Sequence, residues 1–157
     1  MTRHGSAWDS PGFLLWHATL RWQRAMREAL DEHGLTHVQF VLLASAWWLG
    51  EQGSPPTQRA LADHAGTDPM MTSQVVRALE AAGMVARVRD EHDRRAWRVH
   101  ATTAGVARLR PALADVEAAD QAFFQPVSDD TLIPRLRTLA GVRPSPQPEN
   151  PHTETRG

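Results

Sequence analysis

A series of helix start and stop signals in the middle of the chain most constrains its fold. Thr57 precedes the segment QRALADHA and is suited to cap a helix there, and Gly66 ends that segment. Asp68 followed by Pro69 is typical of an N-cap with proline in the first helical position, and Gly83 is suited to close the helix that follows. Two helices of about eight and fourteen residues, separated by a short turn with a glycine, predict a helix-turn-helix.

Two short strands with a charged turn between them follow the second of these helices. MVARVR and AWRVH have strand patterns, with Trp97 and Val99 on one face of the second strand. The intervening DEHDRR predicts a hairpin with a charged tip. A hairpin directly after a helix-turn-helix indicates a winged helix, so the expected fold class is mainly α with a small β-hairpin wing (α+β).

Apolar periodicity predicts further helices on both sides of this unit. They are expected over residues 13–33, 37–50, 103–125 and 128–140. Pro111 lies inside the third of them, so we expect a kink or a restart at that point. The C-terminal tail is rich in proline and lacks large apolar residues, which predicts disorder.

Positive charge gathers in the part of the chain that holds these motifs, although the formal net charge is −1. Residues 59–110 contain nine arginines and six acids, whereas residues 1–58 contain four arginines and five acids. Residues 111–157 contain four arginines and seven acids. The helix-turn-helix and the hairpin therefore lie in the electropositive third, as in proteins that bind nucleic acid.

Composition excludes several classes of protein. With 157 residues the chain has the length of one domain, and without cysteine it has no disulfide, thiolate zinc site or cysteine nucleophile. The longest apolar run, FVLLASAWWLG, is shorter than the ~20 residues that span a bilayer, and the N-terminus lacks a signal-peptide pattern. We therefore expect a cytoplasmic protein without a membrane partner. Because no phosphate loop, nucleophile elbow or carboxylate pair is recognisable, we expect neither an enzyme nor a cofactor.

Three segments together resemble the MarR family of winged helix-turn-helix transcriptional regulators: TQRALADHAG, SQVVRALEAAGMV and DRRAWRVHATTAG. The resemblance runs over residues 14–140. The wing motif of the family matches Asp93, Arg94 and Arg95, and its helix-ending motif matches Leu79, Glu80 and Gly83. The chain departs from the family at Asp68, Pro69, Met70 and Met71, where small and basic residues are commoner, and it lacks the cysteine of the thiol-oxidation branch.

The resemblance implies a homodimer whose N-terminal and C-terminal helices pack across a two-fold axis, while two winged helices read a pseudo-palindromic operator. It implies a regulator that responds to a ligand, more often a repressor than an activator. The expected division of the chain is a flexible N-terminus over 1–12, an N-terminal dimerisation helix over 13–35, a winged helix-turn-helix over 36–101, C-terminal dimerisation helices over 102–141, and a disordered tail over 142–157.

The predicted contacts with double-stranded DNA come from three elements. They are Arg59 on the first helix of the motif, Met70, Thr72, Ser73, Gln74 and Arg77 on the second, and Arg87, Arg89, Arg94 and Arg95 on the hairpin. Gln74 is suited to read adenine, Arg77 to contact guanine or phosphate, and Met70 or Met71 to touch a thymine methyl group. Arg94 and Arg95 would enter the minor groove, and Asp93 would hold an arginine there through a charge-assisted pair. Arg59 would clamp a phosphate, while Arg87 and Arg89 are open between backbone contact and plain surface charge.

An aromatic effector pocket lined by Trp16, His17, Trp47 and Trp48 is a further hypothesis, and core or interface packing of these tryptophans is its alternative. We expect no metal site, because Gly34 interrupts the helix between His33 and His37. Two alternatives to a ligand-responsive regulator remain: a winged helix used for protein interaction, and a histidine-based metal-responsive regulator.

Overall fold

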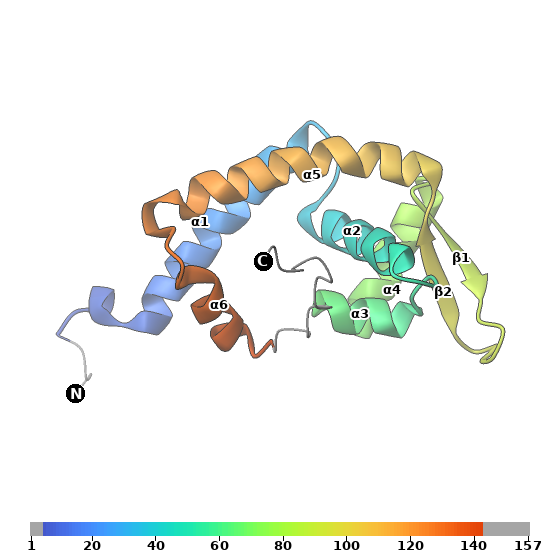
Figure 1. Cartoon of the computed structure of the whole chain (residues 1–157), viewed down its shortest axis with the longest axis horizontal. Helices are drawn as coiled ribbons and strands as arrows, with labels where there is room; N and C mark the ends of the chain where they lie inside the picture. Colours follow the sequence, from blue (N-terminus) through green and yellow to red (C-terminus); the bar gives the residue numbers. More distant parts are fainter. Residues whose placement is uncertain (1–4, 143–157) are drawn as a thin grey trace, which may run out of the picture. The chain divides into compact units, whose positions relative to one another are not determined.

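The computed structural model describes residues 5–142, which form a mostly helical fold with one two-stranded antiparallel sheet (Figure 1). The elements are η1 (Ala7–Asp9), α1 (Pro11–Asp31), α2 (His37–Glu51), α3 (Gln58–Ala65), α4 (Pro69–Ala81), β1 (Val85–Arg89), β2 (Trp97–Ala101), α5 (Thr103–Phe124), η2 (Gln125–Val127) and α6 (Leu132–Ala140). The expected fold class is confirmed. None of the described helices is both long enough and apolar enough to cross a membrane.

The chain divides near Phe123 into two units, the first holding the elements from η1 to α5 and the second holding η2 and α6. Most of the tail predicted to be disordered and the first four residues of the predicted flexible N-terminus lie outside the described residues. Within the described part of the N-terminus, Ala7–Asp9 forms a short 3-10 helix, and the Trp8 ring packs edge-on against Phe13 at 5.1 Å.

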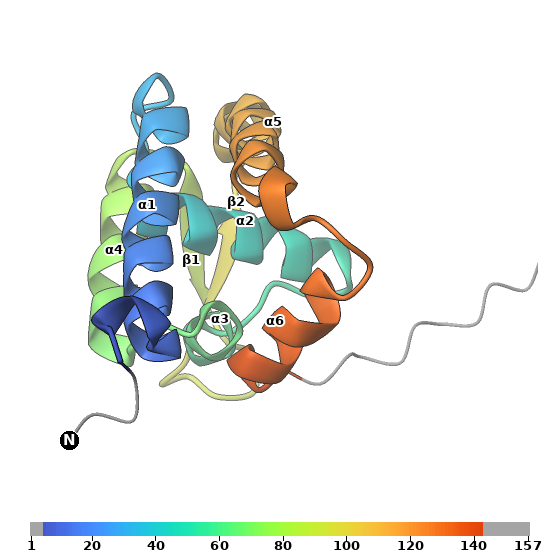
Figure 2. The same ribbon diagram turned by 90° about the vertical axis from the view of Figure 1, so that its left-hand side faces the viewer.

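The helix-turn-helix forms from the capping signals that the sequence carries. The Thr57 hydroxyl accepts a hydrogen bond from the Ala60 backbone N–H at 3.1 Å and so starts α3, and Gly66 ends α3 in the left-handed conformation at φ 66°. The Asp68 carboxylate accepts from two N–H groups of the first turn of α4, where Pro69 is the first residue. Gly83 follows α4 at φ 73°, a backbone conformation that favours glycine. Figure 2 views α3 nearly end-on, while α4 runs from top to bottom along the left-hand side.

The hydrophobic core of this unit is built around α2, which contacts α1, α3, α4 and β2. Leu42 and Leu43 of α2 have no exposed surface, and fully or almost fully buried side chains reach them from the other elements. These are Leu30, Leu61, Val76, Leu79, Val85, Val99 and Leu109. Because α2 is apolar nearly all round, it is buried on several sides and fixes the positions of the helix-turn-helix and the hairpin together.

The wing, meaning β1, β2 and the turn of residues 90–96 between them, is fastened to the start of the helix-turn-helix. The strands pair from Val85 opposite Ala101 to Arg89 opposite Trp97. Along its other edge, β2 receives the segment before α3, because the Val99 N–H donates to the Pro56 carbonyl at 2.9 Å. The wing therefore cannot turn independently of the segment that leads into α3.

Three polar contacts between described residues join α5 to α1 and to the turn that follows it. Trp22 donates its indole N–H to Asp120 at 2.6 Å, His33 Nε2 lies 2.6 Å from an Asp115 carboxylate oxygen, and Arg108 donates to the His33 carbonyl at 2.7 Å. The N-terminal half of α1, by contrast, presents large apolar side chains to solvent. They are Leu14, Leu15, Trp16 and Leu20, with 44% to 61% of their surface exposed.

Both C-terminal helices bear on the expectations from the sequence. Helix α5 runs from Thr103 to Phe124 as one element with Pro111 inside it, so of the kink or restart expected there the restart does not occur. Helix α6 begins at Leu132, four residues later than predicted, because the Asp129 carboxylate accepts hydrogen bonds from both the backbone N–H and the hydroxyl of Thr131. Those bonds stabilise a turn in place of the first helical turn.

The first turn of α5 lies against the end of α4 and leaves no room for a side chain at Gly105. A Cβ atom there would lie 1.9 Å from the Met84 carbonyl oxygen. We predict that Gly105→Ala lowers the free energy of unfolding by about 1–3 kcal/mol, because the backbone must move to relieve the overlap. Urea denaturation at matched protein concentration measures the change.

Gly50→Ala is the matched control, because Gly50 also lies in a helix but has no atom within 4 Å of an added Cβ. We expect that variant to be as stable as the parent or more stable, by up to about 1 kcal/mol. Equal stability of Gly105→Ala and the parent would contradict the close contact between α5 and Met84.

Candidate DNA-binding interface

The exposed face of α4 carries most of the residues predicted to read DNA. Met70 at its N-terminal end has 73% of its surface exposed, and Gln74 and Arg77 are also exposed. Ser73 is half-buried on the same helix. Because residues three and four apart share a helix face, Met70, Ser73 or Gln74, and Arg77 form one stripe along α4.

The N-terminus of α4 is closed to a phosphate group. The Asp68 carboxylate accepts from the N–H groups of Met70 and Met71 at 2.9 and 3.0 Å. Free N–H groups at a helix N-terminus bind anions, but here a carboxylate already occupies them and adds a negative charge. This end of α4 is therefore suited to touch base edges through Met70 and Met71 and is unsuited to hold the DNA backbone.

Thr72 cannot contact DNA, and its prediction as a contact residue is wrong. Its side chain has no exposed surface. The hydroxyl donates to the Asp68 carbonyl at 2.8 Å and lies 2.7 Å from the Thr67 hydroxyl, which must be the donor in that pair because Thr72 has a single hydroxyl proton. Thr72 thus fastens the turn between α3 and α4 from inside.

The wing turn is organised by Asp90, a residue that the sequence analysis did not single out. Only 4% of its surface is exposed, and its carboxylate accepts from the N–H groups of His92 and Asp93 at 2.8 Å each and from Nε of Arg98. The N–H groups of Asp93 and His92, followed by the Arg98 side chain, hold the pKa of Asp90 below its ordinary value. Asp90 directly follows β1, and Arg98 lies on β2 opposite Val88, so their contact depends on the pairing of the two strands.

Asp93 supports the turn in a different way from the one predicted. Its carboxylate accepts from the backbone N–H of Arg95 at 2.9 Å, and its carbonyl accepts from the Ala96 N–H. The expected pair between Asp93 and an arginine side chain is absent from the described residues. Arg94 and Arg95 are exposed, and their guanidinium groups make no hydrogen bond or ion pair to other described residues.

Arg87 and Arg89 are engaged inside the wing by Trp97. The guanidinium carbon of Arg89 lies 4.0 Å from the centre of the Trp97 ring and that of Arg87 lies 5.0 Å from it. Arg87 also pairs with Glu80 at 2.6 Å, which lowers the pKa of that carboxyl, and Arg89 donates to the Arg94 carbonyl at 2.9 Å. These contacts give both arginines a role within the fold, and they favour that role over plain surface charge.

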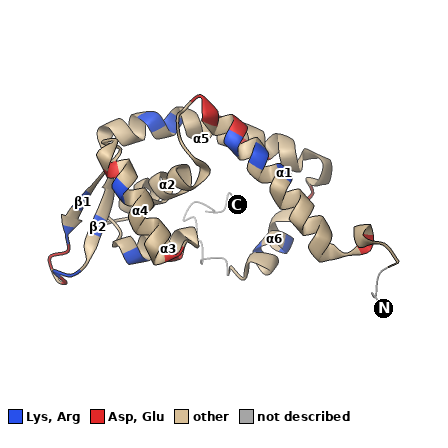
Figure 3. Cartoon of the chain, turned by 180° about the vertical axis from the view of Figure 1, so that it is seen from behind, with Lys and Arg blue, Asp and Glu red and all other residues tan. Residues whose placement is uncertain are grey.

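Arginines from the helix-turn-helix and from the wing meet at one surface hollow. Arg59 at the start of α3 and Arg95 of the wing turn both line it, together with Trp97. In Figure 3 basic residues mark α3, α4 and the wing, and acidic residues alternate with them around the wing turn. The fold therefore places Arg59 and Arg95 where one duplex could meet both.

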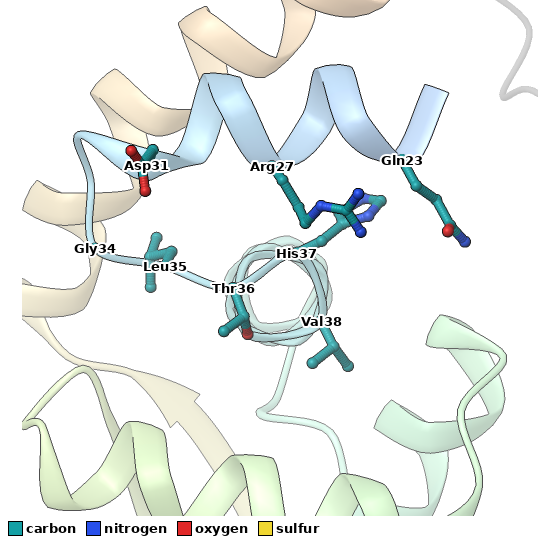
Figure 4. A pocket seen from close by; sticks show the side chains of 8 residues that line it. All are labelled: Gln23, Arg27, Asp31, Gly34, Leu35, Thr36, His37 and Val38. Atoms are coloured by element: carbon teal, nitrogen blue, oxygen red, sulfur yellow. The ribbon is translucent and has the colours of Figure 1, made fainter. Parts of the chain in front are cut away.

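A second hollow of about 620 Å³ lies at the junction of α1 and α2 (Figure 4). Its lining consists of Gln23, Arg27, Asp31, Gly34, Leu35, Thr36, His37 and Val38. Burial lowers the pKa of His37, the charge of Asp120 opposes that shift, and the charge of Arg27 adds to it. The Trp22 ring stands edge-on to the His37 ring at 5.1 Å. The hollow thus combines the Arg27 guanidinium group and the Asp31 carboxylate with the His37 ring.

The four residues predicted to line an effector pocket do not surround this hollow. His17 packs against Phe13 at 4.5 Å, and Trp47 lies partly buried against the core. Trp16 and Trp48 have 61% and 54% of their surface exposed. Sequence reasoning missed Arg27 and His37 because they meet only through the turn that joins the two helices.

In the described part of the chain no three histidine and acidic side chains gather as metal ligands would.

A helix-turn-helix with an exposed reading helix and an arginine-bearing wing defines a winged-helix transcriptional regulator. Residues 35–97 match the model of the MarR family. YdcH of Bacillus subtilis, an uncharacterized HTH-type transcriptional regulator, is 47% identical over 115 residues, which cover 73% of this chain and 78% of that protein. An HTH-type transcriptional repressor of Mycobacterium tuberculosis is 34% identical over 74% of this chain and 81% of its own.

Similarity extends to solved structures. CouR of Rhodococcus jostii, bound to p-coumaroyl-CoA, superposes with a TM-score of 0.76 at 31% identity, over 87% of this chain and 93% of its own. The chain belongs to the MarR family of transcriptional regulators.

The burial of Thr72 beside the half-buried Ser73 gives a test of which residue reads DNA. We predict that Thr72→Val lowers the free energy of unfolding by about 1–2 kcal/mol, because both hydrogen bonds are lost, and leaves base preference unchanged. Ser73→Ala is the control, and it should change base preference with little effect on stability. Thermal unfolding and competition between DNA variants measure the two properties. A Thr72→Val protein with parental stability and altered base preference would contradict the assignment.

Proposed function

We propose that the protein is a homodimeric repressor that binds a pseudo-palindromic operator and releases it when a small anionic effector binds. The observation that carries the proposal is the joint placement of the exposed α4 stripe and the two unpaired arginines of the wing. Sequence-specific binding requires side chains that contact base edges and side chains that contact the DNA backbone, held in one rigid unit.

In this proposal α4 lies in the major groove. Gln74 reads adenine, Arg77 contacts guanine or phosphate, and Met70 packs on a thymine methyl group. Arg94 and Arg95 enter the neighbouring minor groove, where negative potential is concentrated in A/T-rich stretches. Arg59 neutralises a phosphate beside the start of α3, and two protomers meet half-sites about one helical turn apart.

The exposed apolar faces support a dimer. The N-terminal half of α1 presents Leu14, Leu15, Trp16 and Leu20, and α6 presents Ile133 and Leu139 with 53% and 74% of their surface exposed. Several large apolar side chains exposed on one helix commonly mark a protein interface. In the proposed dimer these helices pack against their counterparts in a second copy of the chain.

The hollow at the α1–α2 junction supports an effector site. Arg27 supplies a fixed positive charge, and His37, whose ring packs against Trp22, supplies aromatic surface, so an aromatic carboxylate fits its chemistry. The site lies between the helix proposed to dimerise and the helix at the centre of the DNA-binding core. A ligand there acts by favouring a dimer geometry in which the two reading helices no longer match the half-site spacing.

The division between reading helix and clamping wing predicts different responses to two substitutions. Arg95→Ala should weaken operator binding and reduce the slope of log K against log salt by about one, because one phosphate-region contact is lost. Gln74→Ala should relax base preference and leave the slope nearly unchanged. Fluorescence anisotropy on specific and shuffled duplexes at several salt concentrations measures both.

Arg110→Ala on α5 is the control for Arg95→Ala, because Arg110 is also exposed and its side chain makes no hydrogen bond or ion pair with other described residues. It should leave the slope unchanged. If Arg95→Ala bound DNA like the parent, the wing would not contact DNA, and a protein-interaction role would become the better account.

The lowered pKa of His37 predicts how anion binding depends on pH. In the free protein, burial and Arg27 keep His37 mostly neutral near pH 7. A bound carboxylate raises the pKa of His37, so binding takes up a proton and affinity for benzoate or p-coumarate should increase as pH falls from 8 to 6. Isothermal titration calorimetry in buffers of different ionisation enthalpy measures the affinity and the proton uptake.

Arg27→Gln should weaken carboxylate binding by about tenfold or more, and His37→Gln should remove its pH dependence. Arg24→Gln is the matched control, since Arg24 is an exposed arginine of the same helix that does not line the hollow. Neutral benzamide binding as tightly as benzoate would show that Arg27 and His37 do not select an anion.

A further inference from the structure

The wing turn contains a buried charge pair that no predicted DNA contact explains. Asp90 is almost completely buried in a turn whose other charged residues are exposed. Its carboxylate makes all its hydrogen bonds to other residues of the wing. Its partner Arg98 is also partly buried, with 30% of its side chain exposed. Both side chains make their hydrogen bonds to other residues of the protein, so the first role of the pair is to stabilise the wing.

Arg98 connects this pair to the helix-turn-helix. While Nε of Arg98 donates to Asp90, another guanidinium nitrogen donates to the Pro55 carbonyl at 2.6 Å. Pro55 lies two residues before Thr57, which caps α3 and forms a bridge with Arg98. A single guanidinium group therefore joins the wing turn to the segment from which the first helix of the motif starts.

The opposite strand holds the tip of the turn in a similar way. Arg89 stacks on Trp97 and donates to the Arg94 carbonyl at 2.9 Å. Arg89 thus holds the Arg94 carbonyl, and the Asp93 carboxylate accepts from the Arg95 N–H. Asp90 in turn holds the backbone of His92 and Asp93, while the side chains of Arg94 and Arg95 stay unpaired. A turn held in this way has little conformational freedom left to lose when its side chains bind.

We propose that Asp90 and Arg98 are positioning residues for DNA recognition, which set the wing turn, and with it Arg94 and Arg95, at a fixed place relative to α3 and α4. The inference rests on the proposed contact of Arg94 and Arg95 with DNA. Asp90 and Arg98 touch no DNA themselves. They act by removing the cost of ordering the wing on binding, and they couple the minor-groove contact to the register of the reading helix.

The direction in which Asp90→Asn changes operator affinity distinguishes a positioning role from a purely electrostatic one. Asp90→Asn keeps an oxygen that can accept from the N–H groups of His92 and Asp93 but loses the charge that holds Arg98. Removing a negative charge near DNA should by itself strengthen binding. Positioning predicts the reverse: a loss of about fivefold to tenfold in operator affinity, the size expected when the backbone of about one further turn residue must be ordered on binding.

Glu91→Gln is the matched control, because Glu91 is the next residue, is exposed, and undergoes the same change of charge. It should bind the operator as tightly as the parent or slightly more tightly. Arg98→Lys keeps the positive charge but cannot reach Asp90 and the Pro55 carbonyl with one planar group, so it should weaken binding as Asp90→Asn does. Affinity of Asp90→Asn equal to or above that of Glu91→Gln would overturn the proposal.

A double-mutant cycle distinguishes the positioning of Arg94 and Arg95 from a general effect on the stability of the fold. In an Arg94→Ala, Arg95→Ala background, Asp90→Asn should cause no further loss of affinity, because the side chains that it positions are gone. A loss of the same size in both backgrounds would mean general destabilisation and would overturn the proposal. If the Arg94→Ala, Arg95→Ala protein itself bound like the parent, the proposed wing contact with DNA would fail instead. Anisotropy titrations at 20 °C, with thermal unfolding of each variant, provide all the values.

Discussion

The attachment of the hairpin to the segment before α3 is the constraint on which the DNA-binding geometry depends. The Val99 N–H bonds to the Pro56 carbonyl, and the Arg98 side chain reaches the Pro55 carbonyl, so β2 is paired along both edges. The same strand buries Val99 in the core around α2. A wing that shares hydrogen bonds and core with the helix-turn-helix keeps its place relative to α4, as readout of two neighbouring grooves requires.

Acidic side chains within the candidate interface neutralise groups that would otherwise bind phosphates at any position along the DNA. The Asp68 carboxylate accepts from the N–H groups at the N-terminus of α4. The Asp90 carboxylate accepts from Arg98 and from the backbone of the turn. Among the described arginines of this interface, those without a hydrogen bond or ion pair are Arg59, Arg77, Arg94 and Arg95. Specific binding gains from this arrangement, since each remaining cation contributes only where the duplex is correctly placed.

Local signals allowed much of the fold to be predicted from the sequence. Thr57, Asp68 and Gly83 act on neighbouring backbone groups, and their roles as caps and stops were confirmed. Thr72 was misplaced because its burial depends on the packing of α4 and not on its own polarity. The Asp90–Arg98 pair and the hollow beside Arg27 arise from contacts across a hairpin and between two helices, which no local pattern encodes. The family resemblance was confirmed, whereas the individual DNA contacts remain predictions.

The central claim is that two copies of this winged helix read one short inverted repeat. Selection of bound duplexes from a random pool, followed by titration of the enriched sequence against a shuffled duplex, tests it most directly. The account predicts an enriched pair of inverted half-sites with centres about one helical turn apart, and a preference of about a hundredfold or more over the shuffled duplex. Enrichment of a single site without its inverted partner, or equal affinity for both duplexes, would contradict it.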